Sequence, residues 1–276
     1  MTIFALLWWA LLFWIGACIG SFLNVCIARW PVNESVVKPR SKCPKCGAAI
    51  AWFDNIPVLS WLILRARCRH CGAPISAIYP AIEILIGLGW VGAVWWLGPT
   101  FTAVRAAVFF TILVGIAITD LKHYLIPDGF TVTGLLFAFA SVLVGYYLRE
   151  QYPFAGPVDA LFGACVGAGA ITIIGWLGEV ALKKEAMGFG DSTLMAMVGA
   201  SLGSARALLT IFAAAALAAV VFLLVVYPVG WMRARSKGEE FEPPLVPFGV
   251  FLAPAALLML IWGKELLAWY LNRVFG

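Results

Sequence analysis

Four cysteines in the first third of the sequence have the spacing of a metal site. They form two Cys-x-x-Cys pairs, Cys43 with Cys46 and Cys68 with Cys71, and 21 residues separate the pairs. Each pair can present two thiolates to one tetrahedral ion, and the glycine after the second cysteine of each pair allows a tight turn. Four thiolates leave no open coordination position, so the pattern predicts structural zinc. The alternative is two reducible disulfides or free thiols, and a reducing compartment disfavours the disulfides.

Two aspartates have the positions expected of a catalytic pair. Asp120 directly follows an apolar run that ends at Thr119, and Asp191 follows the segment Gly188-Phe189-Gly190. In aspartic proteolysis one carboxylate takes a proton from a water molecule, and the other, protonated, polarises the scissile carbonyl. We therefore predict that Asp120 and Asp191 are catalytic. Taken singly, Asp191 could instead cap a helix, and Asp120 could be an ordinary charge at a membrane interface.

Four further residues are predicted to support this pair. Gly188 and Gly190 belong to the segment that carries the second aspartate. Asp128 follows a proline and has the position of a helix N-cap. Glu83 lies within an apolar run, where an acid should face the interior of a helix bundle and help to bind substrate or support a polar network.

The composition indicates the environment in which these residues work. Of 276 residues, 63% are hydrophobic and 12% are charged, and the mean hydropathy is +0.96. Soluble domains carry about 25% charged residues. The chain therefore has too little polar surface for a soluble enzyme, a disordered protein or a fibrous protein, and its net charge of +5 is too small to indicate nucleic acid. A polytopic membrane protein is predicted.

Eight apolar runs are candidate membrane helices, since about 20 apolar residues cross a bilayer. They cover residues 3–27, 78–97, 102–119, 130–148, 160–182, 192–203, 207–232 and 248–270. The predicted fold is an all-α polytopic membrane protein with about eight transmembrane helices and one small zinc-binding cytoplasmic loop domain. Its predicted parts are a first helix (1–28), the four-cysteine domain (29–77) and a transmembrane peptidase domain (78–276).

Pairs of glycines four residues apart are predicted to mark close helix packing. They are Gly16 with Gly20, Gly163 with Gly167, and Gly199 with Gly203.

The orientation in the membrane follows from the basic residues of the loops. Segments 28–77, 120–129, 183–191 and 233–247 hold 14 of the 19 Lys and Arg residues. Cytoplasmic loops are enriched in such residues. We therefore expect both termini outside the cytoplasm, and the cysteine loop and both aspartates on the cytoplasmic side.

Several motifs together resemble one known family, the bacterial prepilin peptidases, also called type IV leader peptidases and N-methyltransferases. Asp120 through Ile126-Pro127-Asp128 fits the first aspartate motif of that family, and Met187-Gly188-Phe189-Gly190-Asp191 fits its GxGD motif. Pro247-Phe248-Gly249 fits a late Pro-Phe-Gly turn. Further matching segments are 20–25, 39–47, 54–57, 67–71 and 79–83.

The resemblance implies a membrane aspartic endopeptidase with Asp120 and Asp191 as the pair. Its substrates would be type IV prepilins or type II secretion pseudopilins, cleaved after a glycine at the cytoplasmic face of the bacterial inner membrane. Many members then methylate the new N-terminus with S-adenosylmethionine, and the four-cysteine loop is associated with that step. No residue here is assigned to the methyl donor, and no nucleic acid is expected as a partner.

One position departs from the family, which commonly has lysine two residues after the GxGD aspartate, where this chain has Thr193. A nearby cation favours the ionised form of a carboxylate pair. Without it, we expect that the pH optimum is higher, that Lys183 or Lys184 takes its place, or that activity is weaker.

Two other classes of protein remain open at this stage. One is a transporter or channel with a zinc-binding regulatory loop, which would place its acids near the midplane. The other is a structural membrane protein whose zinc loop binds a partner.

Overall fold

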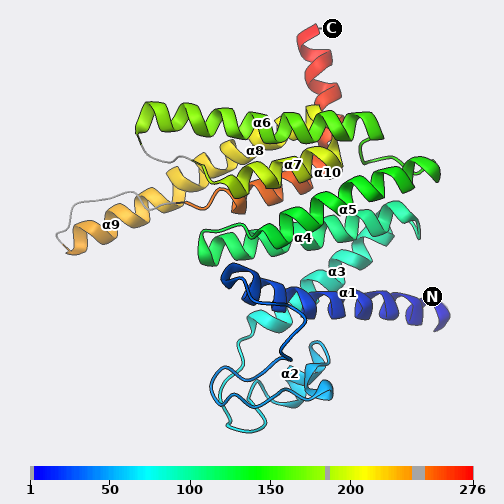
Figure 1. Cartoon of the computed structure of the whole chain (residues 1–276), viewed down its shortest axis with the longest axis vertical. Coiled ribbons are helices and arrows are strands. Elements are labelled where there is room, and N and C mark those ends of the chain that lie inside the picture. Colours follow the sequence, from blue (N-terminus) through cyan, green and yellow to red (C-terminus); the bar gives the residue numbers. More distant parts are fainter. Residues whose placement is uncertain (1–2, 184–186, 238–245, 276) are drawn as a thin grey trace. The chain divides into compact units, whose positions relative to one another are not determined.

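The computed structural model describes residues 3–183, 187–237 and 246–275, and it confirms the predicted all-α membrane fold (Figure 1). The described residues form no strand, only two isolated β-bridges. Seven helices of the described part are long and apolar enough to cross a membrane. They are Ile3–Val32, Ile78–Leu97, Phe101–His123, Asp128–Tyr147, Pro157–Ala181, Ser204–Arg233 and Gly249–Val274.

The sixth predicted run, 192–203, corresponds to α7, Phe189–Leu202, which is shorter than a membrane span. Its 14 residues extend over about 21 Å, whereas the hydrocarbon core of a bilayer is about 30 Å thick. At its far end the carbonyl of Ser201 accepts a hydrogen bond of 2.9 Å from the N–H of Ala155, in the connection between two longer helices. The sixth predicted helix is therefore present but too short to cross a bilayer by itself.

The chain divides into two compact units, Met1–Gly115 and Ile116–Gly276, called unit 1 and unit 2 below. In unit 1, α1 (Ile3–Arg29) packs along α3 (Ile78–Leu97). Helix α4 (Phe101–His123) begins in unit 1, where the indole N–H of Trp90 donates to the hydroxyl of Thr111 over 3.2 Å. The loop between α1 and α3 contains η1 (Trp30–Val32), η2 (Trp52–Asn55) and the short helix α2 (Leu59–Ile63).

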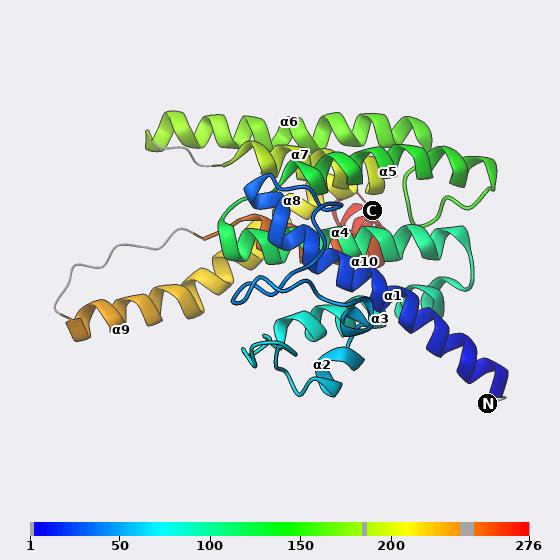
Figure 2. The ribbon, with the colours of Figure 1, turned by 60° about the horizontal axis from the view of Figure 1, so that its bottom comes forward.

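Unit 2 is built around α7. It contains the end of α4 and then α5 (Asp128–Tyr147), α6 (Pro157–Leu182), α7, α8 (Ser204–Val221), the π-helical turn η3 (Phe222–Val226), α9 (Tyr227–Lys237) and α10 (Gly249–Phe275). Figures 1 and 2 both show α7 next to α6 and α5, and these helices pack against it. Leu194, Met195 and Val198 of α7 are completely buried, so α7 forms the core of the unit.

The glycine pairs mark close helix packing, as predicted. A Cβ on Gly163 of α6 would overlap the carbonyl oxygen of Gly199 of α7, and the reverse substitution would overlap in the same way. In unit 1, a Cβ on Gly20 would lie 2.8 Å from the Cα of Glu83. Gly203 differs, because its φ of 89° ends α7 in a turn that other residues rarely adopt.

Polar groups fix the turn between α7 and α8. The carboxylate of Asp159, in the first turn of α6, accepts hydrogen bonds from the backbone N–H and the hydroxyl of Ser204, at 3.1 and 3.2 Å. The buried guanidinium of Arg206 donates to the carbonyl of Pro153 over 2.5 Å. These bonds hold the C-terminal end of α7, and they restrict sliding of the helix that carries Asp191 at its other end.

Replacing Gly163 with alanine should destabilise the packing of α6 on α7. Overpacking of this kind costs about 1–3 kcal/mol, so the thermal unfolding midpoint of the protein in detergent should fall. Gly169 on the same helix is the matched control, because a Cβ there meets nothing within 4 Å. Gly169→Ala should keep or slightly raise the midpoint, since alanine favours helix more than glycine does. An equal loss of stability in both variants would contradict this packing.

Candidate functional site

Asp120 lies in the last turn of α4 and is buried, with 5% of its surface exposed. Its Oδ2 accepts a hydrogen bond of 3.2 Å from the backbone N–H of Val250, in the first turn of α10. The first N–H groups of a helix have no partner within the helix, and the helix dipole makes this end favourable for negative charge. The start of α10 therefore binds the carboxylate of Asp120.

Asp191 has a similar environment at the start of α7. It is the third residue of the helix and only 9% exposed, and its Oδ2 accepts a hydrogen bond of 3.2 Å from the N–H of Gly188. The N–H of Asp191 in turn donates to the carbonyl of Gly188 over 3.1 Å. Gly188 is the N-cap and has no side chain, so only the half of a capping box in which the N3 side chain binds the N-cap N–H is formed, and Asp191 caps its helix from N3 and not as the N-cap residue itself. Capping also fixes the direction of the side chain.

Ile126 joins the surroundings of the two aspartates. A Cβ on Gly190, next to Asp191, would lie 2.8 Å from the Cβ of Ile126. A Cβ on Gly249 would lie 2.9 Å from the Cδ1 of Ile126 and 2.7 Å from the Oδ2 of Asp120. Only glycine fits at either position without displacing its neighbours. The end of α4, the start of α7 and the start of α10 thus converge around Ile126.

Two opposing effects act on the charge of these carboxyl groups. Burial and mutual repulsion oppose a state in which both carboxylates are ionised. The N–H groups of Val250 and Gly188 oppose a state in which both are protonated, because they stabilise negative charge. A pair with one proton is the state in which two carboxyl groups act as acid and base together.

The other predicted supporting residues have different positions. Gly188 is the N-cap of α7, and Gly190 makes the close approach to Ile126. Asp128 is exposed and is the first residue of α5, whose N-cap is Pro127, so the predicted N-cap position of Asp128 is wrong by one residue. Glu83 belongs to unit 1. It is buried, as predicted, and its Oε2 accepts a hydrogen bond of 2.7 Å from the N–H of Val58.

Thr193 is uncharged and so places no positive charge near the aspartate pair. Its hydroxyl donates to the carbonyl of Gly190 over 3.0 Å, within its own helix. Lys183 is exposed at the C-cap of α6, and Lys184 lies outside the described residues.

Sequence reasoning missed the partners of Asp120. Val250 had no predicted role, and neither Gly249 nor Ile126 was chosen as a site residue. The Pro247-Phe248-Gly249 motif contains Gly249, and the Ile126-Pro127-Asp128 motif contains Ile126, so the sequence did draw attention to both segments. Nothing in the motifs themselves indicates that they meet.

The four predicted metal ligands come together in unit 1. One Sγ atom from each of Cys43, Cys46, Cys68 and Cys71 lies within 4.8 Å of the others, and the sulfurs of Cys43 and Cys71 are 3.9 Å apart. A zinc–sulfur bond of about 2.3 Å gives a tetrahedron with edges of about 3.8 Å. None of the seven cysteines, all of which the structure describes, forms a disulfide. The four sulfurs therefore fit one tetrahedral metal ion.

The two cysteine pairs adopt the same backbone turn. The N–H of Gly47 donates to the carbonyl of Cys43, and the N–H of Gly72 donates to the carbonyl of Cys68, both over 2.9 Å. Both glycines have positive φ, 72° and 67°, as the sequence predicts.

Backbone N–H groups of these turns favour the thiolate form at two of the four cysteines, whereas burial and the neighbouring cysteines raise the pKa of Cys46 to about 11. The N–H groups of Cys46 and Lys45 lower the pKa of the Cys43 thiol to about 6. Those of Cys71 and His70 lower the pKa of Cys68. The thiolate is the form that binds metal.

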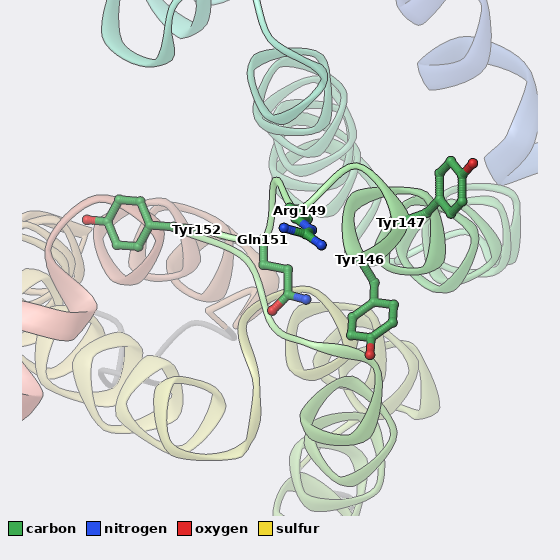
Figure 3. A pocket seen from close by; sticks show the side chains of 5 residues that line it. All are labelled: Tyr146, Tyr147, Arg149, Gln151 and Tyr152. Carbon is green, nitrogen blue, oxygen red and sulfur yellow. The ribbon is translucent and has the colours of Figure 1, made fainter.

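A separate pocket of about 520 Å³ lies where α5 connects to α6 (Figure 3). It is lined by Tyr146, Tyr147, Arg149, Gln151 and Tyr152. Helix α5 is 20 residues long, which is about 30 Å. The pocket is therefore about one helix length away from Asp128, at the end of α5 opposite to the aspartates.

Comparisons with known proteins give two family matches and several relatives. Residues 14–97 match the family described as the bacterial peptidase A24 N-terminal domain, and residues 107–223 match the type IV leader peptidase family. A curated "Prepilin leader peptidase/N-methyltransferase" of Myxococcus xanthus is 42% identical over 84% of this chain and 67% of its own length. Proteins with the same name from Aeromonas hydrophila and Pseudomonas aeruginosa are 33% and 30% identical over 97% and 94% of this chain, and 95% and 91% of their own lengths.

No solved structure matches the chain. The two family matches and the relatives of 30–42% identity together show that the chain belongs to the type IV leader peptidase family.

Proposed function

We propose that the chain is a membrane aspartic endopeptidase that removes the leader of prepilins or pseudopilins, with Asp120 and Asp191 as the catalytic pair. The observation that carries the proposal is the convergence of these two buried carboxylates at the starts of α10 and α7. The relatives are named prepilin leader peptidases, which supports the substrate class.

The pair supplies both an acid and a base for hydrolysis. The ionised carboxylate takes a proton from a water molecule, whose oxygen attacks the scissile carbonyl carbon. The protonated carboxyl donates a hydrogen bond to the carbonyl oxygen, which becomes negative as the tetrahedral intermediate forms. When the C–N bond breaks, the proton taken from the water passes to the leaving amine. The pair then returns to its state with one proton.

The position of the pair suits a substrate that lies partly in the membrane. Asp120 ends one candidate membrane span, and its partner Val250 is the second residue of another. A prepilin has a basic leader followed by an apolar helix, so its scissile bond lies at the headgroup level. The loop charges support a cytoplasmic location for this site in the bacterial inner membrane, with cleavage after glycine as in the family.

The four-cysteine cluster is proposed to bind one structural zinc ion. A loop of about 50 residues is too small to form a core of its own, so a metal ion would hold it together. The names of the relatives support a second activity, N-methylation of the new N-terminus, for which S-adenosylmethionine is the expected methyl donor. No residue of this chain is assigned to that donor.

A transporter or channel is not favoured. Such proteins place functional acids near the bilayer midplane, where discontinuous helices meet. Here Asp120 and Asp191 lie at helix ends that converge around Ile126.

Asp120→Asn and Asp191→Asn should each lower cleavage of a purified prepilin in detergent by about 10²–10⁴-fold or more, because general acid–base catalysis is lost. Glu179→Gln is the control, since Glu179 is an exposed acid at the end of α6, and this variant should cleave normally. Gel shift of the substrate measures the rate. Cleavage retained in both asparagine variants would refute the proposed pair.

Cys46→Ser and Cys68→Ser should each reduce bound zinc from about one ion per chain to nearly none, because a structural site needs all four ligands. Elemental analysis of the purified protein measures the zinc. Cys165→Ser, at an exposed cysteine of α6, should keep it. A full complement of zinc in both ligand variants would show that the four sulfurs do not bind the ion.

Thr193→Lys should move the alkaline limb of the pH–rate profile to lower pH, by up to about one unit. An added cation favours the ionised carboxylate, so the proton that the pair must keep leaves at lower pH. Thr193→Met, with a long uncharged side chain, should leave the profile in place. A profile that does not move in the lysine variant would show that a charge at this position has no effect on the pair.

A further inference from the structure

The helix α2 of the cysteine loop has an apolar face that the described part of unit 1 leaves uncovered. Leu59, Leu62 and Ile63 are 42%, 57% and 73% exposed. They lie at positions i, i+3 and i+4, which is one face of a helix. On another side of the helix, the indole N–H of Trp61 donates to the carbonyl of Ile75 over 3.1 Å. The face directed away from the protein is thus the apolar one, opposite to the pattern of a water-soluble loop.

Two aromatic side chains next to α2 are exposed as well. Trp52 and Phe53 belong to η2, which contacts α2, and they are 73% and 48% exposed. Arg69 holds η2 in place, since its guanidinium makes two hydrogen bonds, of 2.6 and 2.8 Å, to Asp54 and lies 5.5 Å from the ring centre of Phe53. The guanidinium of Arg69 also lowers the pKa of Asp54, so this ion pair persists at neutral pH.

A hydrogen bond fixes α2 at the level of a membrane span. Val58, directly before α2, donates its N–H to Glu83, the sixth residue of α3. Glu83 is five residues beyond the first residue of α3, which is about 7.5 Å along the helix axis. The hydrogen bond therefore places the start of α2 beside the second turn of α3, a candidate membrane span. Val58 also has a φ of 58°, which is costly for a β-branched residue. In both views α2 lies beside the α1–α3 pair and not beyond its end (Figures 1 and 2).

The charge of the loop matches an anionic membrane surface. Residues 29–77 contain eight Lys and Arg residues and two acids, a formal charge of +6, which falls to +4 when four thiolates bind one Zn²⁺ and is still clearly positive. Arg65 and Arg67 lie two and four residues after the end of α2 and are exposed, and within the described residues neither has an ion-pair partner. Basic side chains at a membrane surface bind anionic lipid headgroups.

We propose that α2 and η2 form a membrane-inserted element, in which Leu59, Leu62, Ile63, Trp52 and Phe53 enter the boundary between headgroups and acyl chains while Arg65 and Arg67 bind lipid phosphates. Amphipathic helices enter this boundary to a depth of about 5–10 Å, which agrees with the level that Glu83 sets. Both ends of the loop continue into membrane spans, so the lipid surface is always within reach. Glu83 then acts as a positioning residue for α2. The proposal does not depend on the peptidase activity.

Photo-crosslinking in the full-length protein tests this proposal. A diazirine-bearing phenylalanine analogue replaces Leu62 or Ile63, and the zinc-containing protein is irradiated in vesicles of phosphatidylglycerol and phosphatidylethanolamine. Mass spectrometry then identifies what the probe has captured. Leu85, an exposed residue of α3, is the lipid-facing control, and Lys45, exposed in the first cysteine turn, is the water-facing control.

Lipid adducts at positions 62 and 63 should approach those at Leu85 and exceed those at Lys45 by about tenfold, as expected for a helix inserted in the lipid boundary. Crosslinks to another part of the protein, or adducts no more frequent than at Lys45, would overturn the proposal.

A second measurement leaves α2 unchanged. The fluorescence difference between the wild-type protein and Trp52→Phe should be quenched by lipids brominated near the headgroup and not by aqueous iodide. Quenching by iodide alone would also overturn the proposal.

Discussion

Two like charges can lie together out of water only if the protein replaces the lost hydration. In unit 2 this replacement comes from two helix N-termini, since the N–H of Val250 binds Asp120 and the N–H of Gly188 binds Asp191. A buried carboxylate without such partners would neutralise by taking up a proton, and the pair would lose its base. The proposed chemistry therefore depends on where α7 and α10 begin.

The position of α7 follows from its packing rather than from its length. The backbones of α6 and α7 are in direct contact at Gly163 and Gly199, where neither residue has a side chain. The hydroxyls of Thr172 and Ser192 lie 3.1 Å apart across the same helix pair. A slip of one residue would rotate Asp191 by about 100° around the helix axis. Small residues and short polar contacts thus make a 14-residue helix rigid enough to orient a carboxylate.

Structural features that depend on residues close together in the sequence could be predicted from it. Hydropathy gives the spans, and the Cys-x-x-Cys spacing with its glycines gives both cysteine turns and their positive φ. The bond between Asp120 and Val250 joins residues 130 positions apart, so no local pattern encodes it. The exposed face of α2 was missed for a related reason. Its five residues lie inside the predicted four-cysteine domain, and only the partners of Trp61 and Val58 show which side of the helix faces outward.

The most direct measurement is a structure of the protein solved by crystallography or electron microscopy, at a resolution that places the two carboxyl groups and the water between them. Asp120 and Asp191 should share one water, each about 2.6–3.2 Å from it, with the starts of α10 and α7 as hydrogen-bond donors. Carboxyl groups on opposite sides of the membrane, or kept apart by intervening side chains with and without substrate, would contradict the account.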